Sequence, residues 1–427
     1  MYPRVIATAD SRRYGRWGTR DAPFEEPQLN ERADDICPRP GSIKPEVTRP
    51  HSPPLYFTSV WECDDTAQAR RLLEGSESGY VYQRDGHPNA DLLAEVCGRL
   101  HGSEHVAVTS SGMAALSLAV LSQLQQGDHL LVSDQLYGRS EWLLTGEAGR
   151  LGIAHTLVDA LDLEAVRAAV QDNTRLMVAE TISNPQLRVT DISALAEILH
   201  AAGARLLIDN TFATPVLCQP LGLGADLVME SVSKMMNGHG DVMLGMLAGS
   251  EDCWQRVPKV CAGWGLASSP MASWLATRGL ATLHLRIGRA MENAMSVASY
   301  LAQQAEQQFG SLLEEVRYPG LPSHPDHELA SRQLQGGFGS MVSFRLAGNE
   351  EVADRFLKAA DSLPFCPSLG EASTTLSHPA STSHRDMDDS QLAKLGITGG
   401  TIRLSVGIES TEFILKAIEQ GLMGAKG

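Results

Sequence analysis

The sequence predicts an α/β protein in which a mainly parallel, doubly wound sheet is followed by a smaller α+β domain. Between residues 105 and 229, short apolar runs alternate with stretches in which apolar residues return every three or four positions. Buried strands that alternate with helices are typical of parallel sheets covered on both faces. After residue 247 this alternation stops, and a long helical stretch leads into a region of short strands mixed with helices.

The expected elements divide the chain into three parts. Six runs are expected as strands of the sheet: His105–Thr109, His129–Ser133, His155–Val158, Leu176–Ala179, Arg205–Asp209 and Asp226–Met229. Helices are expected between them at Ala114–Leu124, Leu163–Val170 and Ile192–Ala202, and then as one long run over Met271–Gln308. Strands at Met341–Arg345 and Thr401–Ser405 and helices at Glu350–Ala360 and Thr411–Leu422 complete the expected C-terminal part. We therefore expect an extended segment over residues 1–85, a large domain over 86–285 and a small α+β domain over 286–427.

Composition and charge exclude several classes of protein. The 35 Lys and Arg residues against 51 Asp and Glu residues give a net charge of −16, which repels nucleic-acid phosphates and anionic lipid. No stretch approaches the roughly 18–20 apolar residues of a membrane span, and the N-terminus lacks the apolar core of a secretory signal. The seven cysteines are an odd number without a C-x-x-C pair, so no disulfide framework and no metal site is predicted. A cytoplasmic protein is expected.

Polar residues follow several expected strands, at the edge where ligands bind in open parallel sheets. Gly112 and Met113 open a helix after the first strand, and the N–H groups of a helix start suit a phosphate, although an ordinary turn is the commoner meaning of such small residues. Asp209 ends the fifth strand and is either a helix cap or a charge partner. The polar stretch from Glu180 to Pro185 follows the fourth strand and is consistent with an Asn-Pro turn.

A lysine follows the sixth strand, between Ser231, Ser233 and a glycine-rich turn. Lys234 is one of only seven lysines in the chain, and a lysine beside an apolar strand is unusual unless it is paired or used chemically. An amine, a carboxylate, two hydroxyls and a phosphate cradle at one sheet edge are the groups that pyridoxal phosphate requires. The sequence therefore predicts a pyridoxal phosphate site.

Nine short motifs occur in order from about Pro53 to the C-terminus. They are Tyr80–Arg84 with Gly86–Asn89, Ser111–Met113, Tyr137–Gly138, Ser183–Pro185, Asp209–Thr211, Ser231–Asp241, Ser368–Gly370, His378–Ala380 and Arg403–Glu409. In this order they resemble the Cys/Met metabolism enzymes dependent on pyridoxal phosphate, which include cystathionine γ-synthase, cystathionine γ-lyase and methionine γ-lyase. The resemblance implies the fold of a type I pyridoxal-phosphate-dependent transferase, with a mainly parallel sheet of the seven-stranded type.

The resemblance also implies how the cofactor, pyridoxal 5′-phosphate, is bound. Lys234 would carry it covalently, and Asp209 would pair with its pyridinium nitrogen. Its phosphate would be bound by the backbone N–H groups of Gly112 and Met113 and by the hydroxyls of Ser231 and Ser233, where the family commonly has Thr at the position of Ser233. Asn184 would lie near the phenolic oxygen of the ring.

Further residues would complete the site. Tyr137 would stack on the ring and help to move protons near the leaving group. Tyr82 and Arg84 would reach the phosphate of a neighbouring subunit, so a homo-oligomer is expected, with a dimer of dimers as its form. The substrate carboxylate would be bound by Arg403, whose planar fork suits a carboxylate, and by the Ser368 backbone.

The resemblance implies γ-elimination or γ-replacement on sulfur amino acids or acylated homoserines, by a lyase or a synthase. β-Elimination from cystathionine or cysteine, methionine γ-lyase activity and O-acylhomoserine sulfhydrylase activity stay open, as does a non-catalytic binding subunit. The family usually has glycine where Arg139 stands, and methionine γ-lyases often have cysteine. Arg139 is therefore expected to favour a substrate with a second negative group, unless it points to solvent or pairs with Glu141 or Glu147.

Overall fold

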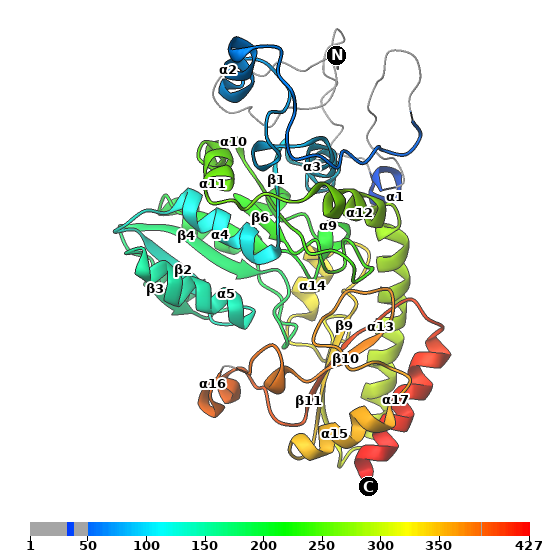
Figure 1. The fold of residues 1–427 in the computed structure, drawn as a ribbon. Coiled ribbons are helices and arrows are strands. Elements are labelled where there is room, and N and C mark those ends of the chain that lie inside the picture. Colours follow the sequence, from blue (N-terminus) through cyan, green and yellow to red (C-terminus); the bar gives the residue numbers. More distant parts are fainter. Residues whose placement is uncertain (1–31, 38–49, 386) are drawn as a thin grey trace.

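The computed structural model describes residues 32–37, 50–385 and 387–427, and these residues form two β-sheets joined by a long helix. Figure 1 shows the large sheet near the middle of the molecule and the small sheet below it, with α13 (Leu283–Glu306) running alongside both. Within the expected extended segment over residues 1–85, residues 1–31 and 38–49 lie outside the described residues. Among the helices in the described ranges, none is long and apolar enough to cross a membrane.

The large sheet has seven strands in the order β1-β7-β6-β5-β4-β2-β3. The strands are β1 (His105–Thr109), β2 (His129–Ser133), β3 (Ala154–Val158), β4 (Thr174–Glu180), β5 (Arg205–Asp209), β6 (Leu227–Glu230) and β7 (Gly245–Gly249). Only β7 is antiparallel to its neighbours β1 and β6. The six predicted strands therefore all run in one direction, and their carboxyl ends lie at the same edge.

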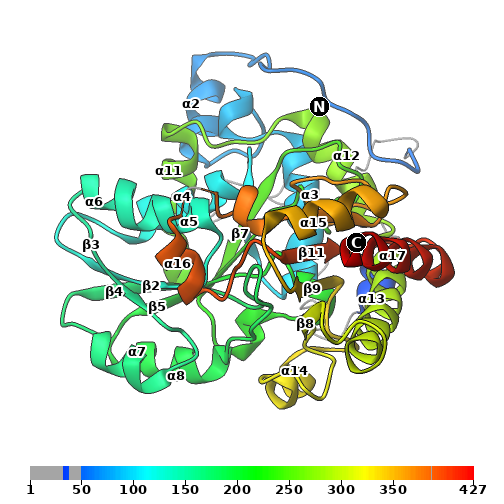
Figure 2. The ribbon, with the colours of Figure 1, turned by 90° about the horizontal axis from the view of Figure 1, so that it is seen from below.

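Helices cover both faces of this sheet, as Figure 2 shows. Leu131 and Met177 point into a core shared with α3 (Pro88–His101), α8 (Ile192–Ala201) and α12 (Pro270–Leu280). Their sequence neighbours Leu130 and Leu176 point into the opposite core, which is shared with α4 (Gly112–Gln123) and α11 (Val257–Gly263). This alternation explains why the strands are apolar along their whole length.

The small sheet is antiparallel, with the order β10-β11-β9-β8. Its strands are β8 (Leu313–Arg317), β9 (Met341–Leu346), β10 (Thr375–Ser377) and β11 (Thr401–Ser405). It shares a core with α13, α15 (Glu350–Ala359) and α17 (Thr411–Lys426), in which the Phe344 and Phe356 rings meet edge to face at 5.2 Å. Other helices include α2 (Thr66–Glu74), η1 (Gln83–Asp85), α5 (Gly138–Trp142), α6 (Ala148–Arg150), α7 (Leu163–Ala169) and α14 (His327–Gln333).

The structure confirms most of the predicted elements and corrects one of them. The predicted helical run over Met271–Gln308 is two helices, α12 and α13, which are separated at Ala281 and Thr282. The predicted boundary between residues 285 and 286 falls inside α13 and stays a prediction. Three strands that the sequence analysis did not predict, β7, β8 and β10, complete the two sheets.

Candidate active site

Lys234 lies in a turn beyond the end of β6, where its amine meets a residue of the C-terminal region. The turn is closed by two backbone hydrogen bonds, from Lys234 N to Ser231 O (3.0 Å) and from Gly238 N to Lys234 O (2.8 Å). The Lys234 amine donates to Ser368 Oγ at 3.0 Å. Burial lowers the pKa of Lys234, and the cation of Arg403 lowers it further, whereas the carboxylate of Glu371 opposes both.

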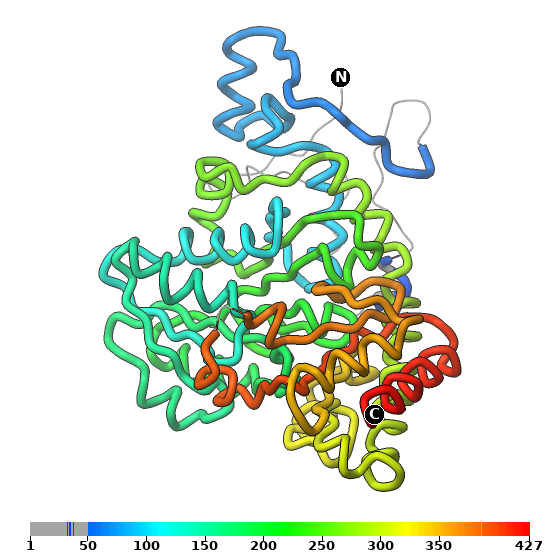
Figure 3. The backbone as a smooth tube through the Cα atoms, turned by 60° about the horizontal axis from the view of Figure 1, so that its bottom comes forward, coloured from blue at the N-terminus to red at the C-terminus, as the bar shows by residue number. Residues whose placement is uncertain are grey.

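The segment that carries Ser368 is held against the Lys234 turn by a glycine. Gly370 has a φ of +87°, and a Cβ there would lie 2.5 Å from Met235 N, so only glycine permits this approach. Gly370 N donates to Ser405 Oγ at 2.8 Å, and Ala372 N donates to Gly238 O at 2.9 Å. Figure 3 shows the orange stretch of the C-terminal region reaching the part of the chain that carries the large sheet.

Asp209 ends β5 with one carboxylate oxygen bonded and the other open. Its Oδ1 accepts from Thr211 N (2.9 Å) and Thr211 Oγ1 (2.6 Å), whereas its Oδ2 receives no hydrogen bond from the described residues. Burial raises the pKa of Asp209 to about 6; the Thr211 hydrogen bonds oppose this rise, and Glu230 adds to it. A cation placed at Oδ2 would stabilise the ionised form.

The start of α4 and the Lys234 turn form a small cradle. Ser111 caps the helix through its Oγ, which accepts from Ala114 N at 3.0 Å. The N–H groups of Gly112 and Met113 have no partner among the described residues, as expected for a first helical turn. A Cβ on Gly112 would lie 2.9 Å from Ser231 Cβ, so a side chain at position 112 would fill the cradle.

The two serines of the Lys234 turn differ. The Ser231 hydroxyl makes no hydrogen bond with the described residues, and Ser231 N donates to Thr211 Oγ1 at 2.9 Å. The Ser233 hydroxyl accepts from Leu244 N (2.9 Å) and donates to Leu244 O (3.0 Å). Ser231 therefore presents an available hydroxyl donor to the cradle, whereas the proton of Ser233 is engaged by the backbone.

Arg403 lies on β11 with only 3% of its surface exposed. Its Nη1 donates to Asn184 Oδ1 at 2.6 Å, and its Nη2 approaches Ser368 O at 3.5 Å. Its Nε is buried and has no partner among the described residues. Burial lowers the pKa of Arg403 to about 10, so the guanidinium stays charged at neutral pH and presents an open donor for an anion.

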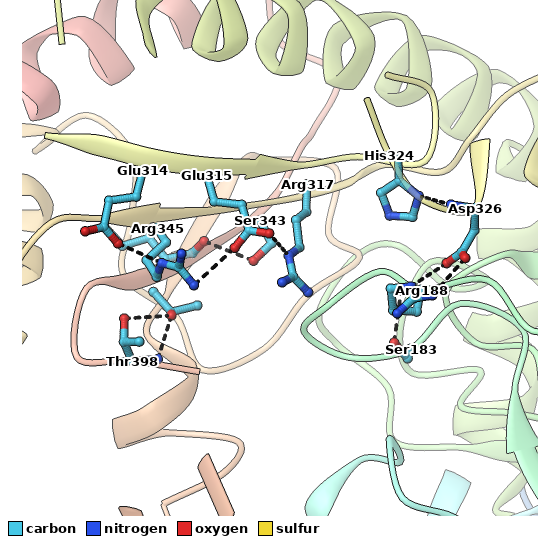
Figure 4. Close-up of polar contacts among 12 residues, drawn as sticks. Ser183, Arg188, Glu314, Glu315, Arg317, His324, Asp326, Ser343, Arg345 and Thr398 are labelled. Carbon is cyan, nitrogen blue, oxygen red and sulfur yellow. Dashed lines mark hydrogen bonds and ion pairs between the residues drawn. The ribbon is translucent and has the colours of Figure 1, made fainter. Parts of the chain in front are cut away.

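The loop that carries Asn184 is anchored to the region between β8 and β9. Ser183 N donates to Arg188 O at 2.9 Å, and Arg188 N donates back to Ser183 Oγ at 3.1 Å. The Arg188 guanidinium then binds both carboxylate oxygens of Asp326, at 2.6 and 3.0 Å, as Figure 4 shows. Asp326 precedes α14, so this bidentate pair fixes the loop of Asn184 relative to the small sheet.

Glu180, at the end of β4, holds two of the predicted site residues by their backbones. Its Oε1 accepts from Tyr137 N (2.8 Å) and its Oε2 from Asn184 N (3.1 Å). Burial raises the pKa of Glu180 well above its usual value, and Asp209 adds to the rise. Sequence reasoning missed this role, although a signal was present: Glu180 ends an apolar strand just as Asp209 does.

Three further predicted residues, Tyr82, Arg84 and Arg139, are exposed. Tyr82 is 42% exposed, and the Arg84 guanidinium lies 5.2 Å from the centre of its ring. The hydrogen bonds and ion pairs among the described residues link neither side chain to Lys234 or Asp209. Arg139 is exposed on α5, and Tyr137, the N-cap residue of this helix, is 36% exposed.

The groups that the fold brings together fit pyridoxal phosphate. The cofactor needs an amine, an anion for its ring nitrogen and donors for its phosphate. Lys234 supplies the amine, Asp209 an open carboxylate oxygen, and the cradle of Gly112, Met113 and Ser231 supplies unpaired donors. The fold and the site thus define a pyridoxal-phosphate-dependent enzyme with the type I fold.

Comparisons with known proteins identify the family. The family model described as "Cys/Met metabolism PLP-dependent enzyme" matches residues 37–423. An L-methionine gamma-lyase of Porphyromonas gingivalis is 38% identical over 86% of this chain and 92% of its own length. An O-succinylhomoserine sulfhydrylase of Pseudomonas aeruginosa is 39% identical over 87% of this chain and 91% of its own. The crystal structure of cystathionine gamma synthase from Xanthomonas oryzae pv. oryzae in complex with cystathionine has a TM-score of 0.86 at 35% identity, and covers 92% of this chain and 98% of that one. The chain belongs to the Cys/Met metabolism family of enzymes, and pyridoxal 5′-phosphate is its cofactor.

Proposed function

We propose that this enzyme catalyses γ-elimination or γ-replacement on sulfur amino acids or acylated homoserines. The observation that carries the proposal is the position of Ser368, whose hydroxyl meets the Lys234 amine (3.0 Å) and whose carbonyl approaches the Arg403 guanidinium (3.5 Å). A group that moves protons and a group that binds carboxylates therefore flank one residue. When bound, pyridoxal phosphate supplies an aldehyde and a ring that accepts electrons from the substrate α-carbon.

Arg403 binds and orients the substrate through its α-carboxylate. Its unpaired Nε and its weakly bonded Nη2 point to the same neighbourhood as Ser368 and can offer two donors to one carboxylate. Asn184 fixes the other end of the guanidinium through the 2.6 Å bond to Nη1. Because the guanidinium is buried, a substrate carboxylate gains more from this pairing than it would at an exposed site.

Lys234 moves protons at its Nζ. It would remove the α-proton of the substrate and later a β-proton. The γ-carbon can then lose its leaving group, which is a thiolate from a sulfur amino acid or a carboxylate from an acylated homoserine. A base must be unprotonated, and the lowered pKa of the buried amine increases the unprotonated fraction near neutral pH. Ser368 Oγ accepts a hydrogen bond from this amine and so orients it.

Asp209 and Tyr137 have separate roles, in charge stabilisation and in proton transfer. Asp209, when ionised, would stabilise a positive ring nitrogen through its open Oδ2. Tyr137 would stack on the ring and assist the proton transfer near the leaving group; its backbone is held by Glu180 while its side chain stays accessible.

The names of the relatives support a reaction at the γ-carbon without separating lyase from synthase. They include a gamma-lyase, a sulfhydrylase and a gamma synthase, all at 35% identity or more. Each of these reactions can use the same amine and the same carboxylate-binding guanidinium, because elimination and replacement differ in whether a thiol adds at the γ-carbon after the leaving group has departed.

We also propose that the enzyme works as a homo-oligomer in which Tyr82 and Arg84 reach the cofactor phosphate of a second subunit. Tyr82 forms a β-bridge with Val60, which is 60% exposed, and Phe57 nearby in sequence is 77% exposed. Helix α11 contacts η1, where Arg84 lies, and is followed by the exposed Trp264. The exposed apolar residues around Tyr82 and Arg84 therefore form a surface that a second copy of the chain could cover.

Product analysis tests the proposed function. Purified enzyme would be incubated with cystathionine, with methionine and with acylated homoserines plus a thiol, and the products identified by mass. We expect 2-oxobutyrate or a new thioether from at least one substrate, and no product from Lys234→Ala. Pyruvate as the sole product would show β-elimination instead, and no turnover of any substrate would favour a binding subunit.

A further inference from the structure

Arg286, in the first turn of α13, is a buried cation bonded to neutral oxygens. It is 7% exposed. Its Nη1 donates to Met235 O (2.8 Å), its Nη2 to Met236 O (3.0 Å) and Gly279 O (2.9 Å), and its Nε to Thr282 Oγ1 (3.1 Å). In the described part of the chain, no carboxylate forms an ion pair with it.

Such an arrangement is unusual, because a buried charge is normally paired with an opposite charge. Burial lowers the pKa of Arg286 only to about 10, so the side chain stays charged at neutral pH. Hydrogen bonds from a charged donor are stronger than neutral ones, and the planar guanidinium fixes the angles between its acceptors. The guanidinium therefore fixes the positions of the Met235 and Met236 carbonyls.

These two carbonyls belong to the residues that directly follow Lys234. The same turn is closed by the hydrogen bond from Gly238 N to Lys234 O at 2.8 Å. Gly238 has a φ of +74°, and a Cβ there would lie 1.9 Å from Arg286 Nη1. The guanidinium thus packs against the backbone of the turn, in space that any other residue at position 238 would occupy.

The same helix makes a second polar contact, at Asn293. This side chain is fully buried, and its Nδ2 donates to Gly407 O and Glu409 O, both at 2.9 Å. Its Oδ1 accepts from Thr411 Oγ1 at 2.7 Å. Gly407 and Glu409 lie in the loop that leaves β11, the strand of Arg403.

Arg286 and Asn293 are seven residues apart, which is about two helical turns and roughly 10 Å along the axis, on the same face. One end of this face holds the turn of Lys234, in the region of the large sheet, and the other holds the loop after Arg403, in the region of the small sheet. Figure 1 shows α13 running past both regions.

We propose that Arg286 and Asn293 are positioning residues, which use α13 as a rigid spacer to set the Lys234 amine at a fixed distance from the Arg403 guanidinium. The inference rests on the proposed roles of Lys234 in carrying the cofactor and of Arg403 in binding the substrate carboxylate. Neither Arg286 nor Asn293 touches the reacting atoms. They act by holding the Lys234 amine and the Arg403 guanidinium in position.

The first test measures cofactor attachment in Arg286→Ala and Arg286→Lys. Each apoprotein is titrated with pyridoxal phosphate, reduced with borohydride and mapped for label on Lys234, with folding followed by circular dichroism. We expect the half-saturating cofactor concentration to rise about tenfold or more in Arg286→Ala, since charged hydrogen bonds to the turn are lost. Arg286→Lys keeps the charge but not the planar guanidinium. Its half-saturating cofactor concentration should lie between those of the wild type and Arg286→Ala. Arg278→Gln, an exposed arginine at the end of α12, should label like the wild type.

Chemical rescue separates positioning from general stability. Methylguanidinium added to Arg286→Ala should restore labelling at low cofactor concentration, whereas methylammonium should not, because only the former reproduces the fork. Normal labelling in Arg286→Ala or Arg286→Lys, even with a lowered melting temperature, would overturn the inference. A wild-type protein that takes no label on Lys234 would instead contradict the proposed function.

The second test addresses the Arg403 end. Asn293→Ala should label normally on Lys234 but bind butyrate, a carboxylate without an amino group, about tenfold more weakly by calorimetry. Gln303→Ala, an exposed amide on the same helix, is the matched control and should bind butyrate like the wild type. Equal binding of butyrate by Asn293→Ala and the wild type would show that Asn293 does not position Arg403.

Discussion

Glu180 and Asp209 lie opposite each other in register at the carboxyl ends of the neighbouring parallel strands β4 and β5. Each carboxylate oxygen of Glu180 accepts one backbone N–H, from Tyr137 and from Asn184, whereas Asp209 keeps one oxygen open. Burial raises the pKa of both carboxyl groups; Asp209 adds to the rise at Glu180, and Glu230 adds to the rise at Asp209. One carboxyl group therefore serves to hold the loops of the site, and the other is available to a cation.

Glu180→Gln should damage the site although the two side chains have the same shape. A glutamine places an NH₂ group against one of two backbone N–H donors, so either Tyr137 N or Asn184 N loses its acceptor. We expect a loss of about 1–3 kcal/mol in unfolding free energy and a fall in kcat, both measured against the wild type. Glu164→Gln, an exposed residue of α7, is the control. Unchanged stability and unchanged kcat would show that the two N–H groups do not depend on Glu180.

Asp209→Asn should change the pH dependence of apoprotein stability. Because the pKa of Asp209 rises from 3.8 to about 6 on folding, the native state holds a proton between these values that the unfolded state has lost. The contribution of this group to stability therefore falls as pH rises through this window, by at most about 1.4 kcal/mol per pH unit. The asparagine variant should lack this slope, as measured by urea unfolding of both apoproteins at several pH values. Parallel stability curves for the two proteins would contradict the raised pKa.

The same variant should also lose turnover, because the ring nitrogen would no longer face an anion. Removal of one electrostatic stabiliser typically lowers a rate by about 10²–10³. Retention of wild-type kcat in Asp209→Asn, with the cofactor bound, would rule out the proposed role.

Much of the fold could be predicted from the sequence, because its strands have a clear pattern. The central strands β2, β4, β5 and β6 are apolar on both faces, and each is short and bounded by polar residues. Strand β7 was missed because glycines flank only three apolar residues, and β8 because its sequence LEEVR reads as a polar segment. The break between α12 and α13 was missed because helical periodicity continues across it, while the break itself exposes Gly279 O to Arg286.

The candidate site could be predicted only in part. Lys234, Asp209 and Arg403 were proposed because short motifs surround them, and the fold brings Lys234 and Arg403 to either side of Ser368. Glu180 and Arg286 act through backbone atoms of residues distant in sequence, 43 positions away for Tyr137 and 51 for Met235. Contacts of this kind leave no local pattern, so only the three-dimensional structure reveals them.

Lys234→Ala should fold but remain colourless after exposure to pyridoxal phosphate, whereas the wild type should be yellow. The reason is that the Lys234 amine faces the site, while Lys259 is exposed on α11. Absorption spectra after removal of unbound cofactor test this, together with borohydride reduction and peptide mapping. Lys259→Ala is the control and should be yellow. Label recovered on Lys259 instead of Lys234 would refute the assignment.

A mixture of two inactive variants should regain activity if the site is shared between subunits. Arg84→Ala and Lys234→Ala each disable every site of their own homo-oligomer. After subunit exchange, a hybrid dimer has one site with both defects and one site with none, so random exchange should restore about a quarter of wild-type activity. Mixing without exchange is the control. If exchange is verified by mass and activity stays absent, Arg84 does not act across a subunit boundary.

Arg139→Ala should distinguish substrates that carry a second carboxylate from those that do not. Arg139 lies two residues after Tyr137, and the start of α5 faces the C-terminal region, since a Cβ on Gly138 would lie 3.1 Å from Ser383 O. A guanidinium beside the distal part of the substrate gains from the second carboxylate of cystathionine and gains nothing from the thioether of methionine. Because Arg139 is exposed, we expect a modest effect, about three- to tenfold in kcat/KM for cystathionine and none for methionine. Arg150→Ala, which removes an exposed arginine at the end of α6, is the matched control and should leave both substrates unaffected. Equal losses on both substrates, or no loss on either, would show that Arg139 does not select the substrate.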